Sequence, residues 1–174
     1  MTDIIVRRAL AGDLQRAGQL GGGLARFHHH RDPDRFFLPE QVDEGYAWWF
    51  AKELKRPNAV VLVALQGEEL VGYAYGAAED RDWNLLLDRH GVVHDIFVAE
   101  HARRLGVGAQ LLDTMVRELE ALGAPRIVLY TMVSNENAQR LFRSRGFRST
   151  MLEMMRSSAG APGGENGGAG GSKS

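Results

Sequence analysis

The stretch from residue 94 to residue 112 contains residue types that suit the binding of an anion. It begins with β-prone apolar residues and ends in a helical pattern, and the bend between them is basic and contains glycines. A strand that enters a helix in this way leaves backbone N–H groups free at the positive end of the helix dipole. Gly106 and Gly108 allow a ligand to approach that backbone, and Arg103 and Arg104 add positive charge. We therefore expect a phosphate or pyrophosphate site at this bend.

Two better-known phosphate loops do not fit the same residues. A dinucleotide-binding fingerprint would need a glycine at position 111, where the chain has Leu111. A P-loop would need a lysine and then a serine or threonine directly after its last glycine, and the chain contains no such motif. A plain nucleotide-binding α/β domain stays open as an alternative, although the first strand–helix–strand unit comes late in the sequence.

Several strands and helices are expected to position this bend. The hydrophobic periods predict strands over 3–8, 59–65, 70–77, 94–98 and 126–132, and a last strand or hairpin over 147–156. They predict helices over 13–24, 39–54, 107–122 and 134–142. The segment 59–65 is apolar on both faces, which is typical of a central strand. The first helix should bend or fray at the glycines 21–23, because each glycine costs about 1 kcal/mol relative to alanine.

Length and composition indicate one globular domain. The chain has 174 residues, 44% of them hydrophobic and 25% charged, and we assign residues 1–156 to the domain. Residues 157–174 are glycine-rich without a large apolar side chain and are expected to be disordered. The net charge of -1 gives no reason to expect nucleic-acid binding, and the absence of cysteine excludes cysteine nucleophiles. The sequence has neither a signal peptide nor a membrane-spanning run, so we expect a cytoplasmic protein without membrane contact.

Three consecutive histidines, residues 28–30, lie in a predicted loop over 27–39. Adjacent histidines do not converge easily on one ion, and no zinc-binding spacing accompanies them. We therefore expect no metal site, and a polar loop or a pocket lining instead. Nearby acidic residues mixed with aromatic ones would equally suit a pocket for a cationic amine. These acids are Asp32, Asp34, Glu40 and Glu44.

Two motifs together resemble those of the Gcn5-related N-acetyltransferase superfamily. The acetyl-CoA motif of that family is Arg or Gln, two residues, Gly, one residue, and Gly or Ala, which Arg103–Gly108 matches. The second motif, Asn-x-x-Ala-x-x-Leu and then Tyr or Phe, occurs at Asn135–Phe142, before a Gly-Phe pair at 146–147. The resemblance covers about residues 3–156. It implies an α/β (α+β) fold: a mixed, mostly antiparallel central sheet with a splayed parallel pair in the middle and helices on both faces.

The resemblance also implies acetyl-CoA as a co-substrate and assigns its contacts. The strand end would offer backbone groups to the acetyl carbonyl and the pantetheine arm, through Ile96, Phe97 and Val98. The bend would hold the pyrophosphate through Arg103, Arg104, Leu105, Gly106, Val107, Gly108 and Ala109. Asn135 would hydrogen-bond the pantetheine arm, and Phe142 stands at the cofactor where family members often have a tyrosine. The simpler alternatives are that the glycines only make a tight turn and that Asn135 only caps a helix.

Acetyl transfer to an amine needs a base for the amine proton and a donor for the developing oxyanion. His94 is the candidate base, because it titrates near neutral pH and stands where polyamine-type family members tend to have glutamate. The alternative is that His94 only satisfies a hydrogen bond at a strand edge. Strand alternation predicts that Asp95 faces the other way, where it is structural or attracts the ammonium. Because Phe142 carries no proton, Tyr130 is the candidate acid for the leaving thiolate, with water or an unassisted thiolate as alternatives.

These residues predict an N-acetyltransferase that moves an acetyl group from acetyl-CoA to a primary amine by direct attack. A small-molecule, cationic amine is the favoured acceptor. The alternative is a catalytically weak acyl-CoA-binding sensor, which the replacement of tyrosine by Phe142 would suit. The resemblance further implies a homodimer, since related enzymes are commonly dimers.

Overall fold

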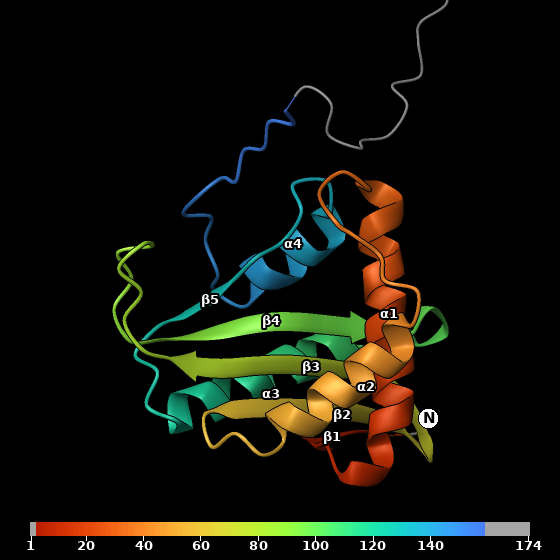
Figure 1. Cartoon of the computed structure of the whole chain (residues 1–174). Helices are drawn as coiled ribbons and strands as arrows, with labels where there is room; N and C mark the ends of the chain where they lie inside the picture. The colour runs from red at the N-terminus through yellow and green to blue at the C-terminus, as the bar shows by residue number, and fades with distance from the viewer. Residues whose placement is uncertain (1–2, 159–174) are drawn as a thin grey trace, which may run out of the picture.

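The computed structural model describes residues 3–158, and one five-stranded sheet lies at its centre (Figure 1). The strands are β1 (Ile4–Arg8), β2 (Ala59–Gln66), β3 (Glu69–Glu79), β4 (His90–Val98) and β5 (Ile127–Leu129). They lie in the order β1-β2-β3-β4-β5, with antiparallel pairs from β1 to β4 and a parallel pair between β4 and β5. The predicted α/β class with a mixed, mostly antiparallel sheet is therefore confirmed.

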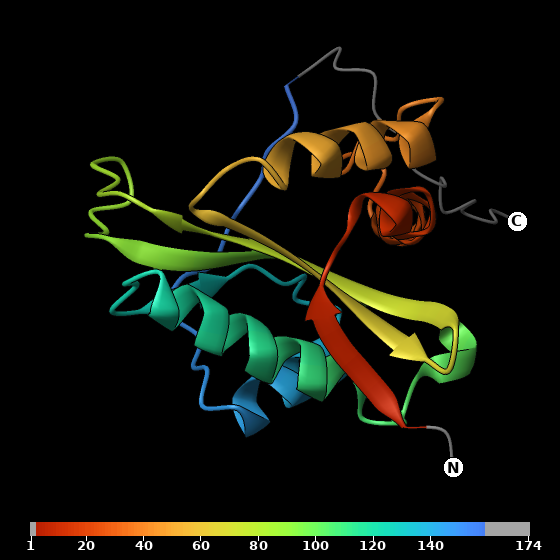
Figure 2. The same ribbon diagram turned by 90° about the horizontal axis from the view of Figure 1, so that it is seen from below.

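Helices cover both faces of the sheet, as Figure 2 shows. On one face lie α1 (Leu14–Arg31) and α2 (Val42–Glu53), and on the other α3 (Val107–Ala121) and α4 (Glu136–Ser144). Two short 3-10 turns, η1 (Ala11–Asp13) and η2 (Glu100–Ala102), precede α1 and α3. No helix within residues 3–158 has the length and apolar character that crossing a membrane requires.

Each face of the sheet has its own apolar core. Alternation along β2 sends Leu62 and Ala64 toward α3, and Val61 and Val63 toward α1 and α2. All four are almost fully buried, which confirms the predicted central strand. The α3 side is filled mainly by residues that recur at helical spacing: Val107, Leu111, Leu112, Met115 and Leu119.

The first helix differs from its prediction. α1 runs without a break through its glycines and histidines to Arg31, so the structure has neither a bend at 21–23 nor a loop beginning at 27. The glycines instead lie against α2. A Cβ on Gly18 would come within 2.5 Å of the Asp43 carbonyl oxygen, and one on Gly21 within 2.5 Å of the Tyr46 ring. Close packing of the two helices therefore offsets the low helix propensity of glycine.

Replacing Gly18 by alanine is expected to lower the free energy of unfolding by about 1–3 kcal/mol, because overpacking costs about that much. The new methyl group would meet backbone atoms of α2. Gly45→Ala, within α2, is the matched control, since no atom lies within 4 Å of its added Cβ. The control should gain up to about 1 kcal/mol from helix propensity alone. Urea unfolding measures both changes, and a stabilised Gly18→Ala would contradict the packing argument.

The parallel pair lies at the end of the sheet, whereas the sequence placed it in the middle. The predicted last strand over 147–156 forms no strand in the described part of the chain, so nothing there extends the sheet beyond β5. β5 itself ends at Leu129, three residues before its predicted end. Most of the segment predicted to be disordered, residues 159–174, lies outside the described residues.

Candidate active site

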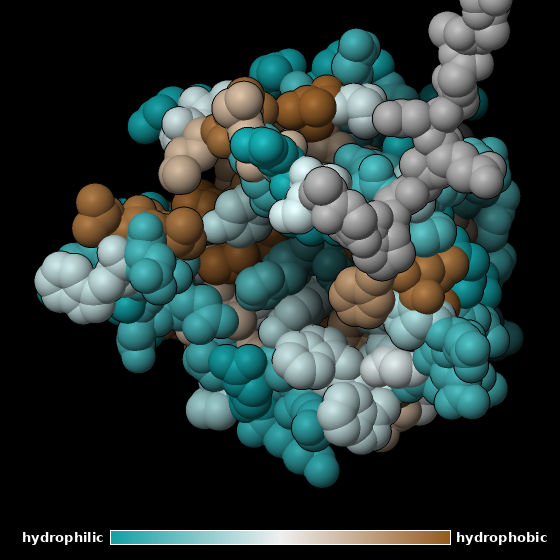
Figure 3. Space-filling view, turned by 45° about the horizontal axis from the view of Figure 1, so that its top comes forward, coloured by the Kyte–Doolittle hydropathy of each residue, from teal (hydrophilic) through white to brown (hydrophobic). Residues whose placement is uncertain are grey.

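β4 and β5 pair over a short ladder and then separate. The ladder runs from Gly91 with Ile127 to Val93 with Leu129, although β4 continues to Val98. The predicted splay of the parallel pair is thus confirmed. Beyond the ladder lies a cavity lined by Leu24, His28, Val93, His94, Asp95, Ile96, Leu129, Tyr130, Thr131, Asn135, Ala138 and Phe142. Figure 3 shows a molecular face that is hollowed near its centre, with both hydrophilic and hydrophobic side chains around the hollow.

A β-bulge in β4 places His94 and Asp95 on one face. Tyr75 pairs with Asp95 and Gly76 pairs with Val93, so His94 is an extra residue without a partner on β3. The His94 ring stacks on the Tyr75 ring at a centroid distance of 5.1 Å. The Asp95 carboxylate accepts a hydrogen bond of 3.1 Å from the hydroxyl of Tyr73, two residues from Tyr75 and in the same core. The prediction that His94 and Asp95 face opposite ways is therefore wrong, because the bulge breaks the alternation.

Asp95 is a partly buried carboxyl group in the cavity wall. Burial raises its pKa to about 6, and the hydrogen bond from Tyr73 opposes that rise. Above this pH the carboxylate is charged but poorly hydrated, so it attracts a cation more strongly than an exposed carboxylate would. Among the described residues that line this cavity, Asp95 is the only one with a carboxyl group.

His94 is held by contacts that end on α2. The Tyr75 hydroxyl donates to the Glu53 carboxylate at 2.6 Å, and Glu53, only 2% exposed, also accepts from Arg56 at 2.9 Å. The stack on Tyr75 fixes the imidazole in place. The surroundings remove part of its hydration and lower the pKa of His94 below 6.5, although Glu79 and Glu53 oppose the shift. The imidazole is therefore mostly neutral near pH 7 and can accept a proton.

The bend before α3 presents a row of free backbone donors. Arg104 and Gly106 have positive φ angles of 66° and 81°, and α3 begins directly after them at Val107. Within the described chain, the N–H groups of residues 104–109 donate to no backbone oxygen, and the next one, on Gln110, bonds to Gly106 at 3.1 Å. Such a row at a helix N-terminus suits an anion, which agrees with the prediction for this bend.

The side chains at the bend have different roles. Arg103 donates through Nε to the Val98 carbonyl at 3.1 Å and lies over the Phe97 ring, so it ties the bend to the end of β4. Arg104 is exposed and forms no ion pair with any residue in the range 3–158. Leu105, which is apolar, is half exposed. Val107 is buried in the α3 core. The other glycine, at 108, lies close to α4, and a Cβ there would come within 3.3 Å of a leucine of that helix.

Three other predicted residues line the cavity. Asn135 caps α4, since its Oδ1 accepts the N–H of Ala138 at 3.2 Å. The side-chain nitrogen of Asn135, Nδ2, makes no hydrogen bond within the described residues. Phe142 is buried and packs edge-to-face against Phe147. Tyr130 is 67% exposed at the cavity. The structure thus brings these three together with His94, Asp95 and Ile96, whereas Phe97, Val98 and the bend lie outside the lining.

The acidic residues predicted to attract an amine do not line the cavity: Asp32, Asp34, Glu40 and Glu44 are absent from its wall. The reason is that α1 extends to Arg31 and carries the following loop beyond the cavity. His28 does line it, and burial together with Arg31 and Arg35 lowers the pKa of His28. Within the described range, no group of three or more acidic, histidine or cysteine side chains is placed to hold a metal ion.

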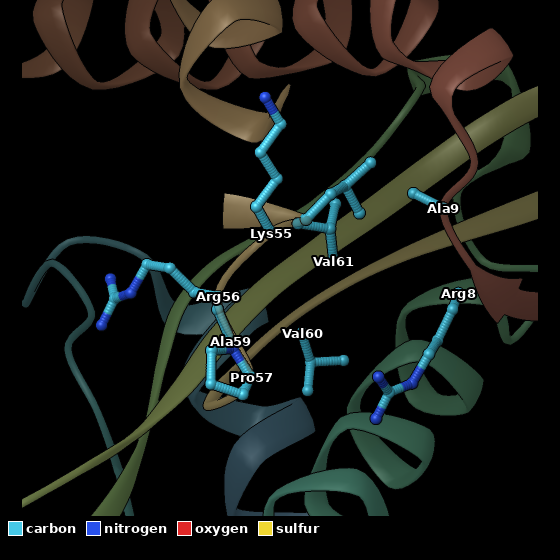
Figure 4. Close-up of a pocket in the computed structure, with 9 residues that line it drawn as sticks. Arg8, Ala9, Lys55, Arg56, Pro57, Ala59, Val60 and Val61 are labelled. Carbon is cyan, nitrogen blue, oxygen red and sulfur yellow. The ribbon is translucent and has the colours of Figure 1, made fainter. Parts of the chain in front are cut away.

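A second depression lies where α2 ends and β2 begins. It is lined by Arg8, Ala9, Leu54, Lys55, Arg56, Pro57, Ala59, Val60 and Val61. Its cationic side chains point in different directions (Figure 4). Arg8 is paired with Glu118, and Arg56 with Glu53. None of the predicted site residues lies here, and the cavity between β4 and β5 is therefore the candidate site.

Sequence reasoning assigned no site role to five residues of that cavity, Leu24, Val93, Leu129, Thr131 and Ala138, and for His28 it gave a pocket lining only as one of two expectations. Leu24 and His28 are four residues apart on α1, so a helix prediction continued through the histidines would have placed both on one face. Thr131 follows the carboxyl end of β5, where parallel strands commonly present ligand contacts.

Comparison with known proteins agrees with this geometry. The model of the Acetyltransferase (GNAT) family matches residues 24–147. An N-alpha-acetyltransferase of Sulfurisphaera tokodaii is 33% identical over 124 residues, which cover 68% of this chain and 72% of that protein. An uncharacterized N-acetyltransferase of Bacillus subtilis, YsnE, is 32% identical over 99 residues, covering 56% of this chain and 61% of that protein.

Solved structures share the fold at lower identity. A tetramutant of the BH1408 protein from Bacillus halodurans superposes with a TM-score of 0.76 at 20% identity, covering 88% of this chain and 99% of that one. The aminoglycoside N-acetyltransferase AAC(6')-Iy in complex with CoA gives a TM-score of 0.74 at 18% identity, covering 91% and 97%. The family match spans well over half of the chain and includes the splayed strands, the bend and Asn135. The chain therefore belongs to the GNAT family of acetyltransferases.

Proposed function

We propose that this protein transfers the acetyl group of acetyl-CoA directly to a primary amine. The observation that carries the proposal is the cavity opened between β4 and β5, which has two proton-accepting groups in its wall, together with the row of free N–H donors in the bend that follows β4. Such a combination suits a long, anionic thioester on one side and an amine on the other.

The residues of the bend fit the anionic part of acetyl-CoA. The N–H groups of residues 104–109 would bind the pyrophosphate, with the exposed guanidinium of Arg104 beside them. Ile96, Phe97 and Val98 lie on the part of β4 that β5 leaves unpaired, so the backbone groups that face away from β3, apart from the Val98 carbonyl that Arg103 already bonds, would be available to the pantetheine arm and the thioester carbonyl. The side-chain nitrogen of Asn135, Nδ2, is a further donor for that arm. When bound, acetyl-CoA supplies an activated acyl group.

Asp95 and His94 have separate roles toward the amine. The Asp95 carboxylate binds the incoming ammonium, and the neutral His94 imidazole takes its proton. The free amine nitrogen then forms a bond to the thioester carbonyl carbon, and the carbon–sulfur bond breaks. The nitrogen gives up its second proton as the amide forms, and this proton replaces the one that the sulfur takes up. The sulfur leaves with the bonding electrons and takes a proton from the Tyr130 hydroxyl or from water, since Phe142 has none to give.

The acceptor we propose is a cationic primary amine. Asp95 supports this choice in place of the acidic residues of the loop after α1, which do not line the cavity. The name of the Sulfurisphaera relative refers to α-amino groups, so an amino-terminal amine belongs among the acceptors to be tested together with small amines. Both would meet the carboxylate as an ammonium ion.

Arg104→Glu is expected to raise the dissociation constant of acetyl-CoA by roughly tenfold to a hundredfold, because a charge-assisted contact becomes a repulsion. Arg126→Glu is the matched control: this arginine is also exposed, but it follows α3 rather than preceding it. Titration calorimetry measures both constants. Equal effects of the two substitutions would contradict a pyrophosphate site at the bend.

The cofactor itself is tested by comparing acetyl-CoA with ATP and NAD in the same calorimeter. We expect acetyl-CoA to bind at least a hundredfold more tightly than either nucleotide, because only acetyl-CoA fills both the bend and the cavity. Preference for ATP or NAD would favour a plain nucleotide-binding domain. Binding of acetyl-CoA without transfer to any amine would instead favour a sensor.

A further inference from the structure

Glu53 is a buried carboxylate that the proposed steps on the amine leave unused. It is the last residue of α2, and only 2% of its surface is exposed. Glutamate is rarely buried to this extent unless it is paired, because a carboxylate loses its hydration inside a protein. Glu53 accepts hydrogen bonds from Arg56 at 2.9 Å and from the Tyr75 hydroxyl at 2.6 Å. The second contact links α2 to the cavity wall, because Tyr75 lies against His94.

The bulge in β4 makes a support for His94 necessary. His94 is the extra residue without a partner on β3, so the ladder does not hold it as it holds Val93 and Asp95. Its side chain is exposed, and the ring makes no hydrogen bond within residues 3–158. The stack on Tyr75 is therefore the contact that orients the imidazole, and both ring nitrogens stay available to the amine.

The Tyr75 ring suits a positively charged imidazole. The two ring centroids are 5.1 Å apart and the ring planes differ by 17°. A cation within about 6 Å of a tyrosine centroid is attracted to the ring face, so the stack favours the imidazolium that forms when His94 takes a proton. Burial and the contact with Glu53 raise the pKa of Tyr75, so its hydroxyl stays protonated and donates to that carboxylate. This hydrogen bond fixes the tyrosine ring and polarises it.

Glu53 is also one of the charges around His94. Partial burial lowers the pKa of His94, Glu79 and Glu53 raise it, and Arg56 and His90 lower it further. Loss of the charge on Glu53 would therefore weaken the base, and it would also leave Arg56 without its nearest carboxylate. The ionisable groups around the imidazole come from several elements: Glu53 and Arg56 from the end of α2, Glu79 from β3, His90 and Asp95 from β4, His28 from α1 and Tyr130 after β5.

We propose that Glu53 is a positioning residue for the proton transfer: through the Tyr75 hydroxyl it holds the His94 imidazole in the cavity wall, and its buried charge stabilises the imidazolium. The inference rests on the proposed function, in which His94 takes the proton of the amine. Within the described chain no residue of α2 lines the cavity, so Glu53 acts through the tyrosine and through its charge without touching the substrate.

Glu53→Gln tests the charge. Glutamine can still accept the hydrogen bond from Tyr75, so the substitution keeps the contact and removes the negative charge. We expect the acidic limb of the kcat profile to move to lower pH. At pH 7 kcat should fall about threefold to tenfold, because a weaker base takes the proton less readily, while the KM for acetyl-CoA stays unchanged. Both come from initial rates at saturating amine and acetyl-CoA, measured between about pH 5 and about pH 9.

Glu118→Gln is the matched control, since this glutamate also pairs with an arginine, Arg8, but lies on α3 at the other face of the sheet. Neither its kcat nor its acidic limb should change. Tyr75→Phe keeps the ring and removes the hydroxyl, so kcat should fall at least about fivefold while both KM values stay within about twofold. An unchanged kcat in Tyr75→Phe would contradict the link. A lowered thermal midpoint of Glu53→Gln with its pH profile in place would show a structural role instead.

Nitrogen-15 NMR of the histidine side chains separates this inference from the proposed function, because it needs no turnover. The protein has six histidines, and the spectrum of His94→Gln identifies the signals of His94. We expect the pKa of His94 to be lower in Glu53→Gln than in the unsubstituted protein and unchanged in Glu118→Gln. Arg56→Gln should raise it, and this substitution of a partly exposed arginine is the second variant if Glu53→Gln does not fold.

The outcomes of the NMR titration are distinct. A pKa of His94 that is equal in the unsubstituted protein, Glu53→Gln and Arg56→Gln would overturn the inference, even in a protein that acetylates amines. The expected shifts in a protein that acetylates no amine would refute the proposed function alone.

Discussion

His94→Gln is expected to lower kcat for amine acetylation by about a hundredfold to ten-thousandfold, the usual contribution of a positioned general base. Glutamine keeps a polar side chain of similar length but cannot accept the proton at neutral pH. In the unsubstituted protein kcat should fall as the pH decreases through the His94 pKa, which lies below 6.5. The pH profile of kcat comes from initial rates at saturating acetyl-CoA, measured between about pH 5 and about pH 9 in steps of about one pH unit.

His101→Gln is the control for this prediction. His101 is also exposed, but it lies in η2 and pairs with Glu69 at 3.2 Å, away from the lining of the cavity. Its substitution should leave kcat within about twofold of the original value, since surface changes are usually small. A His94→Gln protein with unchanged kcat and an unchanged acidic limb would remove His94 from the mechanism.

Asp95→Asn is expected to raise the free energy of unfolding by about 2–3 kcal/mol at pH 7 while it weakens amine binding. Burial raises the pKa of Asp95 from 3.8 to about 6, so the folded state binds a proton between these values that the unfolded state has lost. The carboxyl group therefore destabilises the fold progressively as the pH rises from 4 to 6, and fully at pH 7. Asparagine carries no charge to bury, and its Oδ1 can still accept the hydrogen bond from Tyr73.

Two measurements on this variant separate its structural effect from its functional effect. Urea unfolding should show the gain at pH 7 and its disappearance at about pH 3, below both pKa values, where the carboxyl group is protonated in both states. The KM for the amine should rise at least tenfold, because the ammonium loses its counter-charge. Asp113→Asn is the control, since this exposed ion pair with Arg145 should cost no more than about 1 kcal/mol when broken. A destabilised Asp95→Asn would show that the carboxylate stabilises the fold, against this account.

The parts of the fold that depend on local spacing could be predicted from the sequence. Three such features follow from patterns within a few residues: the apolar stripe of α3, the strand β2 that is buried on both faces, and the strand–bend–helix around Gly106. The cap of α4 at Asn135 is equally local. These features also carry the family motifs, so the cofactor side of the candidate site followed from them.

The proposed acceptor side of the site depends on contacts between distant segments. There the sequence predicted the wrong facing for Asp95 and wrongly placed the acidic residues of the loop after α1 at the pocket. The bulge at His94 arises from the register between β3 and β4, which no local pattern encodes. The glycines of α1 looked like a weak point because their packing partner, α2, lies more than twenty residues further along. The apolar segment at 147–156 has the composition of a strand, but a strand also needs an edge to pair with, and the single chain does not bring one to it.

The central claim is direct transfer from acetyl-CoA to an amine in the cavity between β4 and β5. It is tested most directly by an assay that follows free CoA while a panel of amines, including amino-terminal peptides and small polyamines, is supplied with acetyl-CoA. We expect CoA release that depends on the amine, an equal amount of acetylated amine by mass spectrometry, and double-reciprocal lines that intersect, as transfer within a ternary complex requires. Tight acetyl-CoA binding with no acetylated product from any amine would contradict the account.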